Sequence, residues 1–103
     1  MQTYICSLSW TDSGVVTLNQ TPDRRAAAKH KADQLGIKIK EIYMTTGETD
    51  MLYILEAPDP ASVAKLVLLM GASSNVRTRT AVAFTADEFD KMLKDIGIVP
   101  QPQ

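Results

Sequence analysis

This sequence of 103 residues contains little of what usually identifies the class of a protein. Its single cysteine, Cys6, cannot form an internal disulfide, and no group of cysteine and histidine residues has metal-site spacing. Eleven Lys and Arg against twelve Asp and Glu give a net charge of −1, which argues against a nucleic-acid partner. The longest apolar run, residues 66–70, is far shorter than the roughly 20 residues of a membrane span, and no signal peptide is evident. We therefore expect a cytoplasmic protein with no membrane partner.

Motifs for catalysis and for cofactors are absent as well. The sequence has no Gly-rich phosphate loop, no His-Glu-x-x-His and no Ser-centred elbow, so we expect no cofactor and no metal. The one histidine, His30, falls on the helical side opposite Ala28 and Ala32, which predicts a solvent-facing residue rather than an acid–base group. An enzyme of this sequence would have to be minimal, with a dry pocket and a few polar groups acting on a reactive substrate.

What the sequence does contain is a clear order of strands and helices. Residues 3–10 and 75–84 alternate with the period of a strand, whereas residues 51–57 are almost continuously apolar, which is typical of a central strand covered on both faces. The alternation slips near Lys40 and Glu41, which predicts a bulge. The predicted elements are strand 3–10, a short helical turn at 15–19, helix 21–35, strand 37–45, strand 51–57, helix 60–70, strand 75–84 and helix 86–96.

Capping residues support the predicted helix starts. Thr21 precedes Pro22 and is expected to cap the first long helix, and Asp59 is expected to cap the second. Thr85 and Glu88 have the spacing of a capping box at the start of the last helix. In that helix, apolar residues recur at i, i+3, i+4 and i+7, which predicts that one face packs: Phe89, Met92, Leu93 and Ile96.

The order β-α-β-β-α-β, followed by a helix, predicts an α+β fold of the ferredoxin-like type. Its four-stranded antiparallel sheet carries both crossover helices on one face, because such crossovers are right-handed. The other face bears apolar side chains and needs a cover. We therefore expect a homodimer through the sheet faces.

Several segments resemble the GYD-domain family of small bacterial and archaeal proteins. The resemblance runs from about Thr3 to Ile96 and has one departure, because Thr49 replaces the tyrosine of the Gly-x-Tyr-Asp signature. The matching segments are residues 4–14, 21–24, 35–36, 43–50, 56–59, 71–78, 83–85 and 88–89.

The resemblance implies a dimeric α+β barrel, in which two ferredoxin-like sheets pack face to face. It implies a GYD-like ferredoxin-like domain at residues 1–97 and a C-terminal tail at 98–103. It does not imply an activity, since fold relatives include cofactor-free monooxygenases, haem-degrading oxygenases, muconolactone-type isomerases and proteins without catalysis.

Five residues are candidates for a ligand site, and each has a plainer interpretation. Trp10 and Tyr43 could line an apolar pocket or simply pack in the core. Asp50 could act as a base in a cleft, or its carboxylate could accept backbone N–H groups of its own turn. Arg77 and Arg79 share a strand face and could hold an anion, or form ion pairs on an edge strand.

Two functions of different class remain open. The sequence favours a dimeric protein that binds a small molecule in the cavity between sheet and helices, without an assigned reaction. The alternative is a cofactor-independent oxygenase or isomerase that acts on a small organic substrate. If a site exists, we expect it where the first two strands end near the Gly47 turn, with residues 11–21 as a lid.

Overall fold

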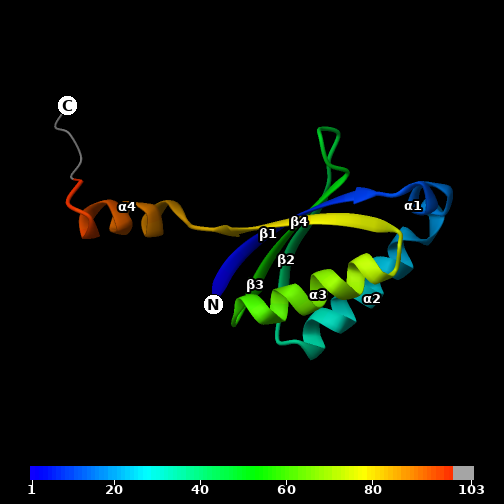
Figure 1. Cartoon of the computed structure of the whole chain (residues 1–103), viewed down its shortest axis with the longest axis horizontal. Coiled ribbons are helices and arrows are strands. Elements are labelled where there is room, and N and C mark those ends of the chain that lie inside the picture. The colour runs from blue at the N-terminus through cyan, green and yellow to red at the C-terminus, as the bar shows by residue number, and fades with distance from the viewer. Residues whose placement is uncertain (99–103) are drawn as a thin grey trace.

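The computed structural model describes residues 1–98, so most of the expected tail at 98–103 lies outside the described residues. Four antiparallel strands form one sheet in the order β2-β3-β1-β4, and two helices lie on the same face of it (Figure 1), which confirms the ferredoxin-like α+β fold. The elements are β1 (Gln2–Trp10), α1 (Asp12–Val16), a 3-10 helix η1 (Leu18–Gln20), α2 (Thr21–Gln34), β2 (Lys38–Met44), β3 (Met51–Ala57), α3 (Pro60–Ala72), β4 (Val76–Ala83) and α4 (Ala86–Asp95).

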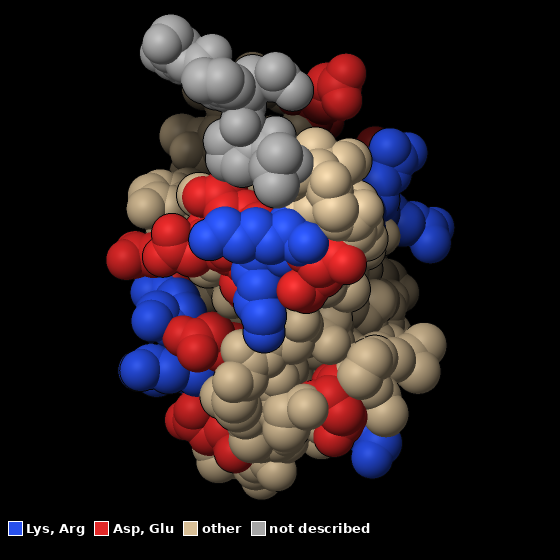
Figure 2. All heavy atoms as spheres, turned by 90° about the vertical axis from the view of Figure 1, so that its left-hand side faces the viewer, with Lys and Arg blue, Asp and Glu red and all other residues tan. Residues whose placement is uncertain are grey.

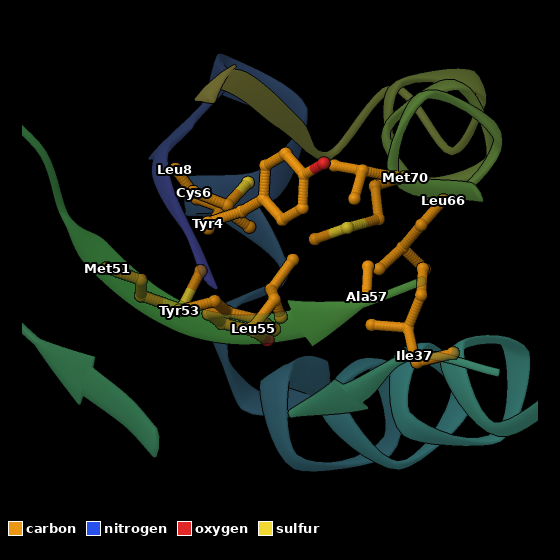
Figure 3. Close-up of a cluster of buried hydrophobic side chains, with 12 residues drawn as sticks. Tyr4, Cys6, Leu8, Ile37, Met51, Tyr53, Leu55, Ala57, Leu66 and Met70 are labelled. Carbon is orange, nitrogen blue, oxygen red and sulfur yellow. The ribbon is translucent and has the colours of Figure 1, made fainter. Parts of the chain in front are cut away.

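The core lies between the sheet and the helices α2 and α3. Every second residue of β1 and β3 points to this side and is buried, and Figure 3 shows these side chains directed toward α3 residues such as Leu66 and Met70. From α2, only the small residues Ala28 and Ala32 are buried, so the helix backbone lies close to the sheet. The buried strand residues are Tyr4, Cys6, Leu8, Met51, Tyr53, Leu55 and Ala57.

Most sequence-based boundaries hold to within two residues, and the predicted bulge is confirmed by a register shift between Ile39 and Glu41. Thr21, however, does not cap α2: the cap position belongs to Gln20, and the Thr21 hydroxyl donates to the carbonyl oxygen of Leu18. The preceding 3-10 turn leads directly into α2, so Thr21 already has helical backbone angles and cannot accept the first free N–H groups.

The central strand β3 is covered on one face only. Its residues alternate between buried and half-buried, and the half-buried ones, Leu52, Ile54 and Glu56, point away from the helices. The apolar character of Leu52 and Ile54 therefore indicates a second cover that residues 1–98 do not supply.

Helix α4 extends away from the rest of the molecule. Figure 1 shows it beyond the end of β4, which gives the described chain a longest dimension of 54 Å against 30 and 17 Å for the others. The predicted capping box is present, with the Thr85 hydroxyl accepting from the Glu88 N–H and the Glu88 carboxylate from the Thr85 N–H. None of its residues is buried, so the expected packing of its apolar face does not occur within the described residues 1–98.

The end of β1 is tied to the start of β4. The Thr11 N–H donates to the carbonyl oxygen of Asn75 at 3.1 Å, and the Thr11 hydroxyl donates to that of Ser74 at 2.6 Å. Gly14 in α1 is buried against the same turn. This close approach fixes Trp10 and Asn75 side by side at one edge of the helix-covered face.

Among residues 1–98, no helix combines the length and apolar character needed to cross a bilayer.

Replacing Gly14 by alanine tests the tie between β1 and β4. A Cβ atom at Gly14 would lie 2.1 Å from the carbonyl oxygen of Asn75, so the backbone must shift. We expect Gly14→Ala to lower the free energy of unfolding by about 1–3 kcal/mol. Gly47→Ala is the matched control, because no atom lies within 4 Å of its added Cβ. Equal stability of the two variants in urea denaturation would contradict the tie.

Candidate functional site

A cavity of about 230 Å³ lies between the sheet and the helices α2 and α3. Its floor comes from the helix-facing side of β1 and β3, through Leu8, Met51 and Tyr53, and its wall from Leu69 and Met70 of α3. Protein interiors rarely leave spaces larger than a water molecule. A hollow of this size in the core layer is therefore a candidate site for a small molecule.

The rim of this cavity on α2 is basic. Arg24, Arg25 and Lys31 all line it, and no acidic side chain is among its described lining residues. Arg24 is held in place by neutral groups, since its guanidinium donates to the Thr17 hydroxyl and, at 3.2 Å, to the Gln20 side chain. Within residues 1–98 the one ion pair joins Lys40 to Glu56, so no carboxylate neutralises the three cations of the rim.

Tyr53 supplies a polar group to the floor of the cavity. The residue is only 4% exposed, and no hydrogen bond joins its hydroxyl to another residue in the described part of the chain, so the hydroxyl oxygen keeps some accessible surface rather than being fully buried. Burial raises the pKa of the Tyr53 phenol, and the nearby positive charge of Arg25 offsets part of that rise. The hydroxyl is therefore protonated at neutral pH and available as a donor.

The structure places Trp10, Tyr43 and Asp50 toward the same end of the sheet, where β1 ends, but does not bring them together in one pocket. Trp10 is on the helix-covered side and lines the cavity. Tyr43 pairs with Leu52, so it lies on the open side, where its side chain is exposed. Asp50 lies between them, and its carboxylate accepts the backbone N–H of Trp10 at 2.9 Å.

Arg77 and Arg79 lie on the open face of the sheet. They pair with Ser9 and Ser7 of β1, and together with Glu48 they line a hollow of about 510 Å³ beside the loop at residues 45–50. In Figure 1 this loop rises on the side of the sheet away from α2 and α3. These two arginines are therefore separated by the sheet from the cavity that Trp10 lines.

The basic rim and Tyr53 were not among the candidates from sequence. The sequence pattern that could have predicted the basic rim is a pair of basic residues beside small core residues. Arg24 and Lys31 are seven residues apart and flank the buried alanines of α2. In the sequence, Tyr53 is an ordinary aromatic residue of an apolar strand, and only the structure shows that it lines the cavity and that its hydroxyl makes no hydrogen bond with the other described residues.

His30 has the character that the sequence predicts, since it is exposed on α2 and does not line the cavity. Cys6 is buried in the core, where desolvation raises the pKa of its thiol despite the opposing effect of the neighbouring Thr80, so it stays protonated and unreactive. Among residues 1–98, no group of three His, Cys, Asp or Glu side chains could hold a metal ion.

Solved structures resemble this fold at low sequence identity. The crystal structure of TTHA0845 from Thermus thermophilus matches with a TM-score of 0.53 and 23% identity, over 84% of this chain and 96% of that one. The Mycobacterium tuberculosis leucine response regulatory protein matches with a TM-score of 0.54 and 14% identity, over 82% of this chain. The match spans about half of that regulator, 51%, so it shows a shared fold for this part alone.

The sequence also matches a named relative and a family model. The Thermus thermophilus protein named glutamine synthetase and cystathionine beta-lyase binding protein is 28% identical over 95 residues, which are 91% of this chain and 100% of the relative. The model of the GYD domain matches residues 4–93. That match includes β2, β3, β4 and the first three helices in full, together with most of β1 and of α4. The chain therefore belongs to the GYD-domain family, as its sequence segments predict, with Thr49 at the signature position.

Proposed function

We propose that this GYD-domain protein is a homodimer that binds a small molecule in the cavity between the sheet and the helices α2 and α3. The observation that carries the proposal is the cavity itself, which combines apolar walls, a basic rim and the hydroxyl-bearing side chain of Tyr53. Such a combination is typical of ligand pockets, in which a few polar groups orient a mostly apolar ligand. Trp10 is the one sequence-predicted site residue that belongs to this cavity.

Two uncovered apolar surfaces support the second copy in this proposal. The open sheet face carries Leu52 and Ile54, and α4 exposes Phe89, Met92 and Ile96. A helix of 10 residues is marginal in water without packing, even with a good capping box. The charged residues around α4 are of both signs (Figure 2), so its surroundings suit a protein surface rather than a polyanion. A partner of the same sequence could cover both surfaces at once.

A second candidate function is binding to another protein. The relative from Thermus thermophilus, matched over its whole length, is named for binding two enzymes. The exposed apolar face of α4 would suit that role as well as it suits a second copy. Neither the family description nor this relative's name supports the alternative of an oxygenase or isomerase. A cytoplasmic location remains a prediction from the sequence.

Narrowing the cavity tests small-molecule binding. Ala27 and Ala26 are adjacent, exposed residues of α2, but only Ala27 lines the cavity. We expect any ligand found by native mass spectrometry of the purified protein to bind Ala27→Leu at least about tenfold more weakly, because the added methyl groups fill the mouth. Ala26→Leu should bind it as the unaltered protein does. Equal loss in both variants, or in neither, would place the ligand elsewhere.

Charged substitutions test the dimer. Phe89→Glu on α4 and Ala81→Glu on the open face each place a carboxylate on an exposed surface without removing core packing. We expect the unaltered protein to sediment as a dimer at micromolar concentration and both variants to shift toward monomer, since burying an unpaired charge is costly. Lys91→Gln changes the charge of α4 by the same amount on its polar side and should leave the dimer intact. A monomeric unaltered protein would contradict the proposal.

Asp50 is proposed as a positioning residue of the scaffold rather than as a base. Its carboxylate holds the N–H of Trp10, and Asp50 does not line the cavity. We expect Asp50→Ala to lower the free energy of unfolding by about 1–2 kcal/mol while leaving ligand affinity within about twofold. Glu48→Gln, in the same loop and exposed, should change neither quantity. Loss of affinity at full stability would instead assign Asp50 to the site.

A further inference from the structure

The cavity between α2, α3 and the sheet is selective by charge as well as by size. Three cationic side chains, of Arg24, Arg25 and Lys31, border it, and its walls are apolar. A charged ligand that binds beside these three cations is expected to be negative. Since the cations project from one side of the cavity, on α2, the negative charge belongs at one end of the ligand and apolar atoms at the other.

The polar groups of the cavity are donors rather than acceptors. The side chains of Arg25 and Lys31 can only donate, and neither side chain takes part in a hydrogen bond or ion pair within residues 1–98. The protonated Tyr53 hydroxyl is a third donor, on the floor of the same cavity. Several donors beside apolar walls are the arrangement that carboxylates and phosphates require, and guanidinium groups can bind both ions through two hydrogen bonds.

The volume limits how large such a ligand can be. About 230 Å³ is below the roughly 300–1,000 Å³ of drug-sized pockets, so the site suits a small metabolite. The sulfur-containing side chains Met51 and Met70 form part of the apolar surface, and unbranched thioethers adapt to tails of different shape.

The competing anion site is less suited to this chemistry. The hollow on the open face also contains two arginines, Arg77 and Arg79, but it includes the carboxylate of Glu48 and is lined mainly by polar residues. An anion there would face repulsion from Glu48, and an apolar tail would have little surface to contact.

We infer that the cavity takes a small amphiphilic anion, with its charged group between Arg25 and Lys31, near Tyr53, and its apolar tail against Met51 and Met70. This inference rests on the proposed function of small-molecule binding and adds the class of ligand. Arg24, held by Thr17 and Gln20, contributes positive potential at the mouth. A carboxylate and a phosphate share this chemistry, and the experiment separates them.

The test compares matched probes on the full chain. 3-Phenylpropanoate and octanoate are titrated against the neutral 3-phenylpropanamide and octanamide, with phenyl phosphate and inorganic phosphate as further arms. Binding is followed by calorimetry and by NMR of labelled methionine methyl groups. We expect the acids to bind at least about tenfold more tightly than the amides, with an affinity that falls as salt rises. Tighter binding of phenyl phosphate than of the acids would identify a phosphate ligand.

The methionines show where each probe binds. Met51 and Met70 line the cavity, whereas Met44 and Met92 are exposed elsewhere and report adsorption to other apolar surfaces. Signals that move at Met51 and Met70 support the inference. Signals that move only at Met44 or Met92, or with inorganic phosphate alone, overturn it.

Charge-neutralising variants complete the test. Arg25→Gln and Lys31→Gln should each weaken binding of the acids by about tenfold and leave the amides unchanged. Lys29→Gln removes one charge from the same helix at an exposed position outside the cavity and should have no effect beyond about twofold. The acids and amides could instead bind equally well, with Ala27→Leu abolishing the binding of both. That result would refute the ligand class but would still support small-molecule binding in the cavity. If no probe moves the cavity methionines, the ligand class and the cavity as a binding site both fail.

Discussion

Two helices cannot cover both faces of a four-stranded sheet, and the rest of this structure follows from that constraint. Right-handed crossovers put α2 and α3 on the same side, where they bury alternate residues of β1 and β3. The other side keeps Leu52 and Ile54 half-exposed, and α4 does not cover it, because this helix extends past the end of β4. The sheet thus separates the molecule into a closed side with a small cavity and an open side suited to a partner.

The closed side contains a cavity because α2 and α3 contribute side chains of different size. Small alanines bring α2 close to the sheet, as Ala28 and Ala32 show, while α3 packs through Val63, Leu66 and Met70. Long basic side chains of α2 then extend over the gap near the ends of β1 and β3. The hydrogen bond from the Thr11 N–H to the Asn75 carbonyl oxygen holds that end of the sheet in place, next to Trp10 and Asn75, which line the cavity. Such support is what a binding site needs in order to keep its shape.

Sequence patterns predicted the elements well because strand and helix periods are local properties. The bulge at Lys40, the cap at Asp59 and the capping box at Thr85 all depend on neighbours within a few residues. Alternation along a strand also predicts which face of the sheet a residue occupies. It does not predict whether two candidate site residues lie close together. Trp10 and Tyr43 lie toward the same end of the sheet on strands that β3 separates, and register places them on opposite faces, which only the pairing of the strands reveals. The place of the Tyr53 hydroxyl on the floor of the cavity could not be predicted at all, because it depends on how the helices pack on the sheet.

The two sides also differ in what their charges can do. On the open face, Arg77 and Arg79 lie beside Glu48, so opposite charges share one hollow, and a second protomer placed there would find partners of both signs. On the closed side, the rim of the cavity contains three cations and no carboxylate: Arg24, Arg25 and Lys31. Repulsion among these like charges costs free energy, and a bound anion would offset that cost. Because the backbone of the sheet separates the two sides, a partner protein and a small anion need not compete for the same residues. A ligand could still influence association through β1, since Leu8 lines the cavity while its neighbours Ser7 and Ser9 line the open hollow.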